Sequence, residues 1–191
     1  QLPLYQASER VAYVQQNPED QFCTLTVQDE IAFGLENLCL NPIIIEQKID
    51  KVLKIVKGSD LKGRDLDSLS GGEKQKVAIA SMLALNPDVL ILDEPTSNLD
   101  PIATQNIFES LNHLRQVEEI TVIIIEHKLD QLLELDPLIF SLDQGHISEG
   151  YQSPDLSNQE VYFSDPGKLS AQGKSNIEEK KPVVQLKNAS I

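Results

Sequence analysis

The sequence predicts an α/β fold in which a parallel β-sheet is covered by helices. Two apolar runs, at residues 89–92 and 120–125, are typical of strands that are buried on both faces. Between them, residues 101–114 carry apolar side chains at helical spacing, so strand, helix and strand alternate. In folds of this kind, ligands bind beyond the carboxyl ends of the strands.

Earlier in the chain, the pattern predicts one strand and two amphipathic helices. Residues 10–14 alternate as in a strand, and the turn that follows ends at Pro18. Thr26 is expected to cap the first helix, and the second is expected to run from Pro42 to Gly58. The apolar stripes of both helices are expected to face the core.

Size, charge and cysteine content restrict the class of protein. The 191 residues suffice for one domain with a sizeable core and a tail. A net charge of -14, without a long run of Lys or Arg, argues against nucleic-acid binding. Cys23 and Cys39 are isolated, which argues against a zinc site or a disulfide framework and suits a reducing cytosol. No stretch approaches the about 18 consecutive apolar residues of a membrane-spanning helix, so we expect another chain to provide any membrane contact.

Two adjacent carboxylates, Asp93 and Glu94, follow the apolar run at residues 89–92. At the carboxyl end of a buried strand they would lie at the mouth of a cleft. One carboxylate can hold Mg²⁺, directly or through water, while the other accepts a proton from an attacking water. Acidic turns after apolar strands are also common, so these two residues alone leave catalysis and an ordinary turn equally open.

A second motif opens the helix that precedes this strand. Ser70 can cap the helix, and Glu73, three residues later, can complete a capping box. Gly71 and Gly72 lack side chains, so a phosphate can approach the backbone N–H groups at the helix N-terminus. A well-capped helix without a ligand is the simpler alternative for this motif alone.

The glycine-containing motif precedes the carboxylate motif by a short helix. Together and in this chain order, the two motifs resemble the nucleotide-binding domain of ABC (ATP-binding cassette) ATPases. Residues 69–73 resemble that family's signature motif, with Glu73 in place of the commoner Gln. Residues 89–94 resemble Walker B, and residues 97–100 resemble the D-loop. The resemblance implies a P-loop NTPase-like three-layer fold with a parallel sheet and an inserted helical subdomain at about residues 24–85. The wording after the first strand looks most like energy-coupling-factor and cobalt-type transporter ATPases.

The resemblance also implies a role for several residues at the end of each strand. Asp93 would hold hydrated Mg²⁺ with help from Gln16, which matches the family's Q-loop, and Glu94 would polarise the attacking water. His127 matches the switch histidine that contacts the γ-phosphate. Without the family pattern, a surface turn would be the better interpretation for Gln16 and for His127. Asp100, which is expected to cap the next helix, would link two nucleotide sites across a dimer interface.

In such a dimer, two cassettes face head to tail, and each ATP lies between the phosphate-binding loop of one and the signature motif of the other. The resemblance therefore assigns nucleotide binding to Ser70, Gly71, Gly72 and Glu73. The cofactors it implies are ATP and Mg²⁺. The partners it implies are a second ABC domain and integral membrane transporter subunits, with no nucleic acid.

The family's phosphate-binding loop, G-x-x-x-x-G-K-[ST], does not occur in this sequence. We therefore expect an N-terminally truncated cassette: residues 1–150 form a partial ABC ATPase domain that ends in a hairpin, and residues 151–181 form a linker. Residues 182–191 are expected to begin a second ABC domain, with an ordinary terminal strand as the alternative. The isolated chain is expected to be inactive as an ATPase.

The function that the resemblance implies is that of the ATP-binding and ATP-hydrolysing subunit of an energy-coupling-factor-like ABC transporter. Such a subunit powers transmembrane transport of a small solute, such as a vitamin or metal ion, from the cytoplasmic face of the membrane. A soluble ABC ATPase acting on the ribosome or DNA is one alternative, although the basic arm or long coiled-coil insertion expected of it is absent from the sequence. A noncatalytic cassette fragment is another.

Overall fold

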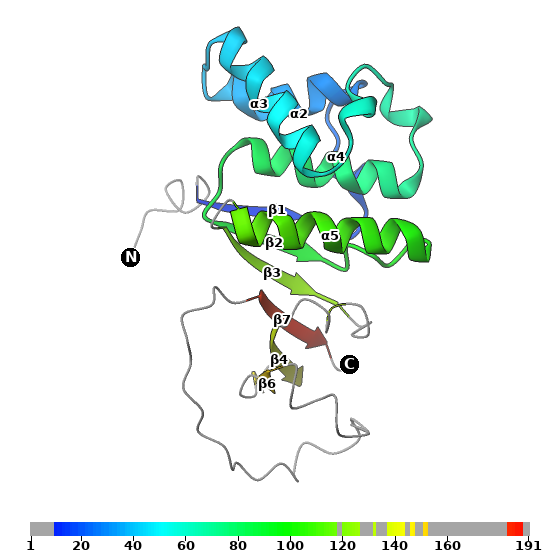
Figure 1. Cartoon of the computed structure of the whole chain (residues 1–191), viewed down its shortest axis with the longest axis vertical. Helices are drawn as coiled ribbons and strands as arrows, with labels where there is room; N and C mark the ends of the chain where they lie inside the picture. The colour runs from blue at the N-terminus through cyan, green and yellow to red at the C-terminus, as the bar shows by residue number, and fades with distance from the viewer. Residues whose placement is uncertain are drawn as a thin grey trace, which may run out of the picture.

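The computed structural model describes residues 10–117, 120–126, 132, 137–143, 146–147, 151–152 and 183–188. Its strands form one sheet in the order β1-β2-β3-β7-β4-β5, with β6 paired to β4 (Figure 1). The strands are β1 (Val11–Val14), β2 (Val89–Asp93), β3 (Thr121–Ile125), β4 (Leu138–Asp143), β5 (His146–Ile147), β6 (Tyr151–Gln152) and β7 (Val183–Asn188). The parallel pairing of β1, β2 and β3 agrees with the prediction.

The helices form two groups relative to this sheet. They are α2 (Val27–Asn37), α3 (Pro42–Ile55), α4 (Gly71–Ala84) and α5 (Pro101–Val117), with short 3-10 helices η1 (Pro18–Asp20), η2 (Ser59–Leu61) and η3 (Leu66–Ser68). The α4 helix packs between the α2–α3 pair and the sheet, and α5 packs beside α4 and along β3 (Figure 1). We refer to the pair α2–α3 as the helical subdomain; the range expected for it, about residues 24–85, also includes α4, and the domain assignment stays a prediction.

Side-chain caps fix where the helices begin, at Thr26 as predicted and at Asn41, for which the sequence analysis predicted no cap. The Thr26 side chain accepts a hydrogen bond from the backbone nitrogen of Asp29 at 3.2 Å, and α2 begins at the next residue. Asn41 accepts from the backbone nitrogen of Ile43 at 2.9 Å, directly before the helix that starts at Pro42. Each cap satisfies a backbone donor that has no partner within its helix.

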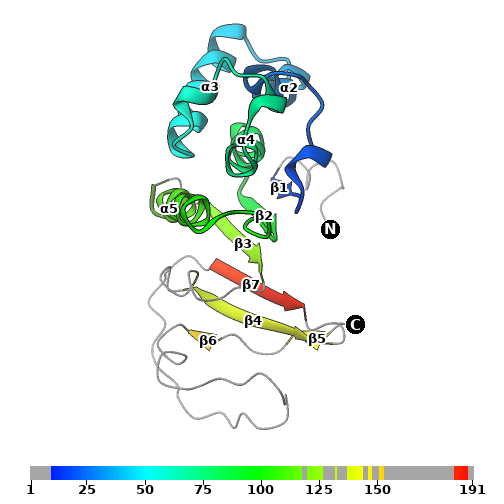
Figure 2. The ribbon, with the colours of Figure 1, turned by 90° about the vertical axis from the view of Figure 1, so that its right-hand side faces the viewer.

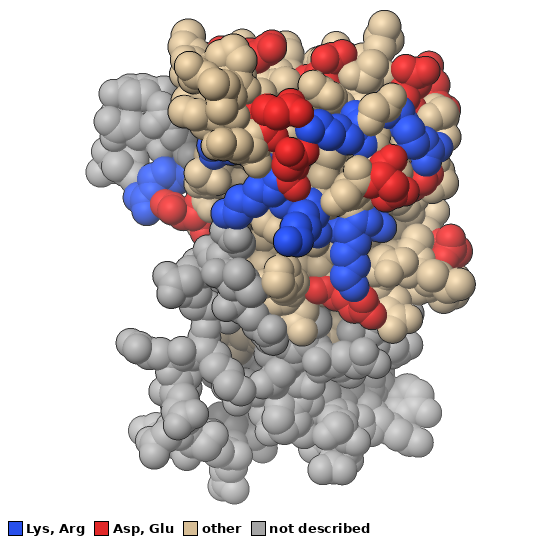
Figure 3. Space-filling model, turned by 45° about the horizontal axis from the view of Figure 1, so that its top comes forward, with Lys and Arg blue, Asp and Glu red and all other residues tan. Residues whose placement is uncertain are grey.

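Charged side chains on the helical subdomain are interspersed and partly paired (Figure 3). Lys62 bonds Asp50 at 2.6 Å, and Lys57 bonds Glu109 at 2.6 Å. Exposed ion pairs of this kind each contribute little to stability, because water and salt screen them. The fold therefore depends mainly on its apolar core, which runs from β1–β3 through α4 to the inner faces of α2 and α3.

The two faces of strands β1–β3 differ in burial, whereas the sequence predicts burial on both. The side chains on one face are almost fully buried: Ala12, Val14, Leu90, Leu92, Val122 and Ile124. On the other face of β1, Val11 is 40% exposed and Tyr13 is 46% exposed. The difference arises because α4 and α5 lie over the same side of the sheet (Figure 2). The described helices leave the second face partly open.

The C-terminal part of the sheet joins segments that are far apart in the sequence. Strand β7 is parallel to both of its neighbours, with Val183 opposite Val122 of β3 and Val184 opposite Leu138 of β4. The predicted hairpin is confirmed, since β4 and β5 pair antiparallel. The stretch predicted as a linker begins with β6, and residues 153–182 lie outside the described residues. A strand at 183–188 fits both alternatives for the terminus, so the domain assignment stays a prediction.

Among the described residues, no helix has the length and apolar character needed to cross a bilayer.

Candidate catalytic edge of the sheet

The carboxyl ends of β1 and β2 bring Gln16 and Glu94 together. The two strands are parallel, with Val14 opposite Leu92, so the residues that follow each strand emerge at the same edge. The Gln16 amide nitrogen donates a hydrogen bond to a Glu94 carboxylate oxygen at 2.7 Å, across 78 residues of sequence. The sequence predicted that both belong to one site, and the structure brings them into contact.

Glu94 has a backbone conformation that is unusual for a residue with a side chain. Its φ angle is +42°, in the left-handed region that costs energy for residues other than glycine. The backbone nitrogen of Glu94 donates to the carbonyl of Ile125, the last residue of β3, at 2.8 Å. This bond ties the turn after β2 to the end of the neighbouring strand.

The neighbouring carboxylate, Asp93, is held by Tyr13. The Tyr13 hydroxyl donates to Asp93 Oδ2 at 2.6 Å. This hydrogen bond is the main reason that the pKa of Tyr13 is raised, and burial adds to it. Sequence reasoning missed Tyr13, because its contact depends on the register that places it opposite Ile91, and register cannot be read from local patterns.

The carboxylates at this edge suit Mg²⁺, an ion that needs only one or two protein ligands. Among the described residues, no group of three or more His, Cys, Asp or Glu side chains could hold a metal ion. Mg²⁺ is commonly bound through one or two carboxylates, several waters and substrate phosphates. Asp93 offers such a carboxylate, so the chemistry of the donor set fits the predicted ion.

A buried hydrogen bond joins the ends of β2 and β3 at the same edge. Thr96, after β2, donates through its hydroxyl to the carboxylate of Glu126, after β3, at 2.5 Å. Both side chains are almost fully buried, so this contact ties the two strand ends together. His127, which directly follows Glu126 in the sequence, lies outside the described residues. Its role as the switch histidine stays a prediction.

The start of α4 has the predicted capping box. The Ser70 hydroxyl accepts from the backbone nitrogen of Glu73 at 3.4 Å, and Glu73 accepts from the backbone nitrogen of Ser70 at 2.7 Å. Arg64 adds a 2.6 Å bond to the second Glu73 oxygen. The backbone and hydroxyl bonds from Ser70, followed by Arg64, lower the pKa of Glu73. The Arg64 contact gives a local reason for a carboxylate where the family motif commonly has Gln.

The two glycines of this motif have different surroundings. A Cβ atom on Gly72 would lie 2.8 Å from the Cβ of Ala103 on α5, so a side chain there would collide with the neighbouring helix. A Cβ on Gly71 would lie 3.8 Å from Leu99, which is ordinary contact. Close packing of α4 on α5 therefore explains Gly72 independently of any phosphate. The predicted nucleotide role of both glycines stays a prediction.

A small hollow joins the three motifs. It has a volume of about 80 Å³ and lies between the turn after β1, the start of α4 and the turn after β2; its lining includes Gln16, Gly71, Gln75, Ser97 and Asn98. Gln75 is 2% exposed, and its amide nitrogen has no hydrogen-bond partner among the described residues. The three segments that resemble the signature motif, the Q-loop and the D-loop therefore meet at this hollow.

Asp100 caps α5, as predicted. Its Oδ1 atom accepts hydrogen bonds from the backbone nitrogens of Ile102 and Ala103, each at 2.9 Å. The side chain is exposed, and it is close in sequence to the hollow at residues 97–99. Its role across a dimer interface stays a prediction.

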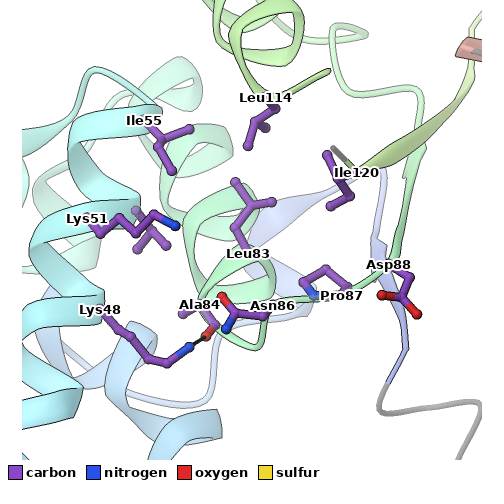
Figure 4. Close-up of a pocket in the computed structure, with 11 residues that line it drawn as sticks. Lys48, Lys51, Ile55, Leu83, Ala84, Asn86, Pro87, Asp88, Leu114 and Ile120 are labelled. Atoms are coloured by element: carbon purple, nitrogen blue, oxygen red, sulfur yellow. Dashed lines mark hydrogen bonds between the residues drawn. The ribbon is translucent and has the colours of Figure 1, made fainter. Parts of the chain in front are cut away.

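A larger pocket, of about 310 Å³, lies away from these residues (Figure 4). Asn86, before β2, and Ile120, before β3, line it, so it opens at the amino ends of strands whose carboxyl ends carry the candidate site. The Lys48 side chain extends from α3 to the end of α4 and donates to the carbonyl of Ala84 at 3.0 Å (Figure 4). Burial, and then Lys51, lower the pKa of Lys48. This pocket contains none of the predicted site residues.

Comparison with known proteins identifies the family of the chain. A family model described as "ABC transporter" matches residues 3–97. The energy-coupling factor transporter ATP-binding protein EcfA of Pediococcus pentosaceus is 43% identical over 141 residues, covering 74% of this chain and 50% of the relative. YkoD of Bacillus subtilis, provisionally named an HMP/thiamine import ATP-binding protein, is 44% identical over 124 residues, covering 65% of this chain and 23% of the relative. The chain thus spans half or less of the length of these two relatives.

A solved structure shows the same fold. CbiO1 from Clostridium perfringens, described as part of the ABC transporter complex CbiONQ, is 31% identical with a TM-score of 0.74, covering 78% of this chain and 60% of CbiO1. The predicted α/β, P-loop NTPase-like fold class is therefore confirmed. With a family match over residues 3–97 and relatives named as ABC transporter components, the chain belongs to the ABC transporter family.

Proposed function

We propose that this chain supplies the catalytic sheet edge and the signature helix of the ATP-hydrolysing subunit of an energy-coupling-factor-like ABC transporter. The contact between Gln16 and Glu94 carries the proposal. It joins a residue predicted to approach the metal and the attacking water to a carboxylate that can accept a proton from that water. The strained backbone of Glu94 is of the kind that persists at functional sites.

Each residue at the edge has a distinct task in this proposal. Gln16 holds the Glu94 carboxylate through its amide, which orients this carboxylate for the attacking water. Asp93 binds hydrated Mg²⁺, and His127 contacts the γ-phosphate. Mg²⁺, when bound with ATP, would neutralise charge on the β- and γ-phosphates. Ser70, at the start of α4, binds the ATP of a second cassette together with the two glycines that follow it.

The half-exposed face of the sheet supports the view that this site needs further protein to be complete. Parallel sheets are normally covered on both faces, and here Val11 and Tyr13 remain 40% and 46% exposed. Asp93 lies on the same half-exposed face of the sheet as Tyr13, its hydrogen-bond partner. A phosphate-binding loop and its helix, contributed by protein outside the 191 residues, would cover this face and supply most of the free energy of ATP binding.

Exposed apolar side chains on the helical subdomain support docking to membrane subunits. Leu25, before α2, is 78% exposed, and Ile43, at the start of α3, is 69% exposed. Phe33, Leu38 and Ile44 are also exposed on these helices. Exposed apolar side chains are typical of an interaction site where they form a contiguous patch, and the proposal takes these five to form one. In the proposal this surface contacts integral membrane subunits at the cytoplasmic face, and the transported solute is a vitamin or a metal ion.

The test is ATP hydrolysis by the protein in its natural length. Replacing Glu94 with Gln should reduce the hydrolysis rate by at least about a hundredfold, because a proton acceptor is lost while ATP binding is kept. Glu36→Gln, an exposed substitution on α2, is the matched control and should leave the rate unchanged. Equal rates for Glu94→Gln and the parent protein would overturn the proposal.

The isolated chain gives a complementary result. The 191 residues alone should show no ATP hydrolysis, because they carry no loop of the G-x-x-x-x-G-K-[ST] type. Turnover by this chain that disappears in Glu94→Gln would show that the site is complete without further protein.

A further inference from the structure

Tyr13 contacts the carboxylate that is proposed to bind Mg²⁺. Its hydroxyl donates to Asp93 Oδ2 at 2.6 Å, from a neighbouring parallel strand. We propose that Tyr13 is a positioning residue that fixes the Asp93 carboxylate for the hydrated Mg²⁺ of the ATP site. This inference rests on the function proposed above, and it concerns a residue that neither the sequence motifs nor the family resemblance includes.

The geometry gives the hydroxyl a specific task. An aspartate carboxylate rotates easily about its last side-chain bond, because that torsion has a broad energy profile. A strong donor on Oδ2 selects one rotation, and it leaves Oδ1 available to the water shell of the ion. Hydrogen bonds to metal-binding carboxylates commonly tune affinity in this way, and their loss typically costs 10- to 100-fold.

Burial does not require this hydrogen bond. Tyr13 is 46% exposed, so water could satisfy its hydroxyl if Asp93 did not. The contact between Thr96 and Glu126 is different, because both side chains are almost fully buried and water cannot easily replace the hydrogen bond between them. Loss of the Tyr13 hydroxyl should therefore affect the ion more than the fold.

The backbone explains why only Tyr13 can reach this carboxylate from β1. Val11 and Tyr13 share the half-exposed face, since residues two apart in a strand point the same way. Val11 lies opposite Val89, at the far end of β2, whereas Tyr13 lies opposite Ile91, two residues before Asp93. A long side chain at position 13 therefore spans the diagonal to the end of the next strand, as the 2.6 Å contact between Tyr13 and Asp93 shows.

The experiment compares Mg²⁺ binding by the parent protein and by Tyr13→Phe, both in natural length. Each is saturated with ATP in the Glu94→Gln background, which prevents turnover, and Mg²⁺ is then titrated while thermal unfolding is followed. Mn²⁺ binding measured by electron paramagnetic resonance gives a second readout that does not depend on activity. We expect Tyr13→Phe to weaken the midpoint for either ion about tenfold. The melting temperature without metal should stay close to that of the parent.

Val11→Thr is the matched control, on the same face of the same strand, and should leave the Mg²⁺ midpoint unchanged. Equal midpoints for Tyr13→Phe and the parent would overturn the inference and leave the proposed function intact. If the parent itself showed no response to Mg²⁺ with ATP, both would be overturned. If Tyr13→Phe lowered the metal-free melting temperature as much as it changed the midpoint, Tyr13 would be structural and the inference would be wrong.

Discussion

At the scale of single residues, Glu73 shows how a departure from a family motif is accommodated. Its two carboxylate oxygens serve different partners, one on Ser70 and one on Arg64. A glutamine in its place could accept only through one oxygen, and it would lose the charge that attracts the guanidinium. The sequence predicted the capping box from spacing alone, whereas the Arg64 contact depends on the loop before η3 and was not predicted.

The lowered pKa of Glu73 has a consequence for stability at different pH values. A carboxyl group whose pKa is lower in the folded state stabilises the fold above its unfolded pKa, and this contribution is lost as pH falls through the folded pKa. The reference value for Glu73 is 4.5, and Ser70 and Arg64 shift it downward. We expect Glu73→Gln to unfold at a lower temperature than the parent at pH 7. The difference should shrink as pH falls below 4.5.

Chemical or thermal unfolding followed by circular dichroism at pH 7 and at acid pH provides the measurement. The effect should be small, because Glu73 is partly exposed and solvent screens its ion pair. A difference that grew toward acid pH would contradict the sign of the shift.

At the scale of elements, α4 connects the helical subdomain to the sheet through close packing. Gly72 lies where α4 approaches α5, and an added methyl group would come within 2.8 Å of Ala103. We expect Gly72→Ala to destabilise the fold by about 1–3 kcal/mol, since overpacking forces the helices apart. Gly71→Ala is the matched control for unfolding, since its nearest contact would be 3.8 Å. Denaturant unfolding measures both, and equal losses for the two variants would show that close packing is not the cause.

The sequence predicted the existence and type of the elements well, because their signals are local. Caps at Thr26 and Ser70 mark where α2 and α4 begin, and apolar runs mark β2 and β3. The position of β7 was not predicted. This strand lies between β3 and β4 and pairs with both, and such long-range pairing leaves no local pattern in the sequence. The half-exposed face of β1–β3 was missed for the same reason: burial depends on which side the helices take.

At the scale of the whole molecule, functional surface is divided between two regions. The proposed catalytic residues Gln16 and Glu94 meet at the carboxyl edge of the sheet, whereas five of the eight exposed large apolar side chains among the described residues lie on or beside α2 and α3. The α4 helix packs on the sheet and on both α2 and α3, so a movement of the subdomain would also move the signature motif. In the proposed function, this arrangement couples ATP binding to the membrane subunits.

Separating the two regions by mutation tests this division. Ile43 is 69% exposed on α3, so Ile43→Asn should cost little stability. We expect this variant to lose co-purification with integral membrane subunits while its affinity for ATP is unchanged. Retention of the membrane subunits by Ile43→Asn, and by a double variant that includes Leu25→Asn, would exclude this surface as their docking site.

The most direct test of the account is a double-mutant cycle on Gln16 and Glu94, measured as the rate of ATP hydrolysis by the natural-length protein. If the amide of Gln16 acts by holding the Glu94 carboxylate, Gln16→Ala should slow the parent protein by about ten- to a hundredfold. It should have almost no further effect on Glu94→Gln, since residues that act as one unit are non-additive. Fully additive losses would show that Gln16 and Glu94 act separately, and would contradict the account.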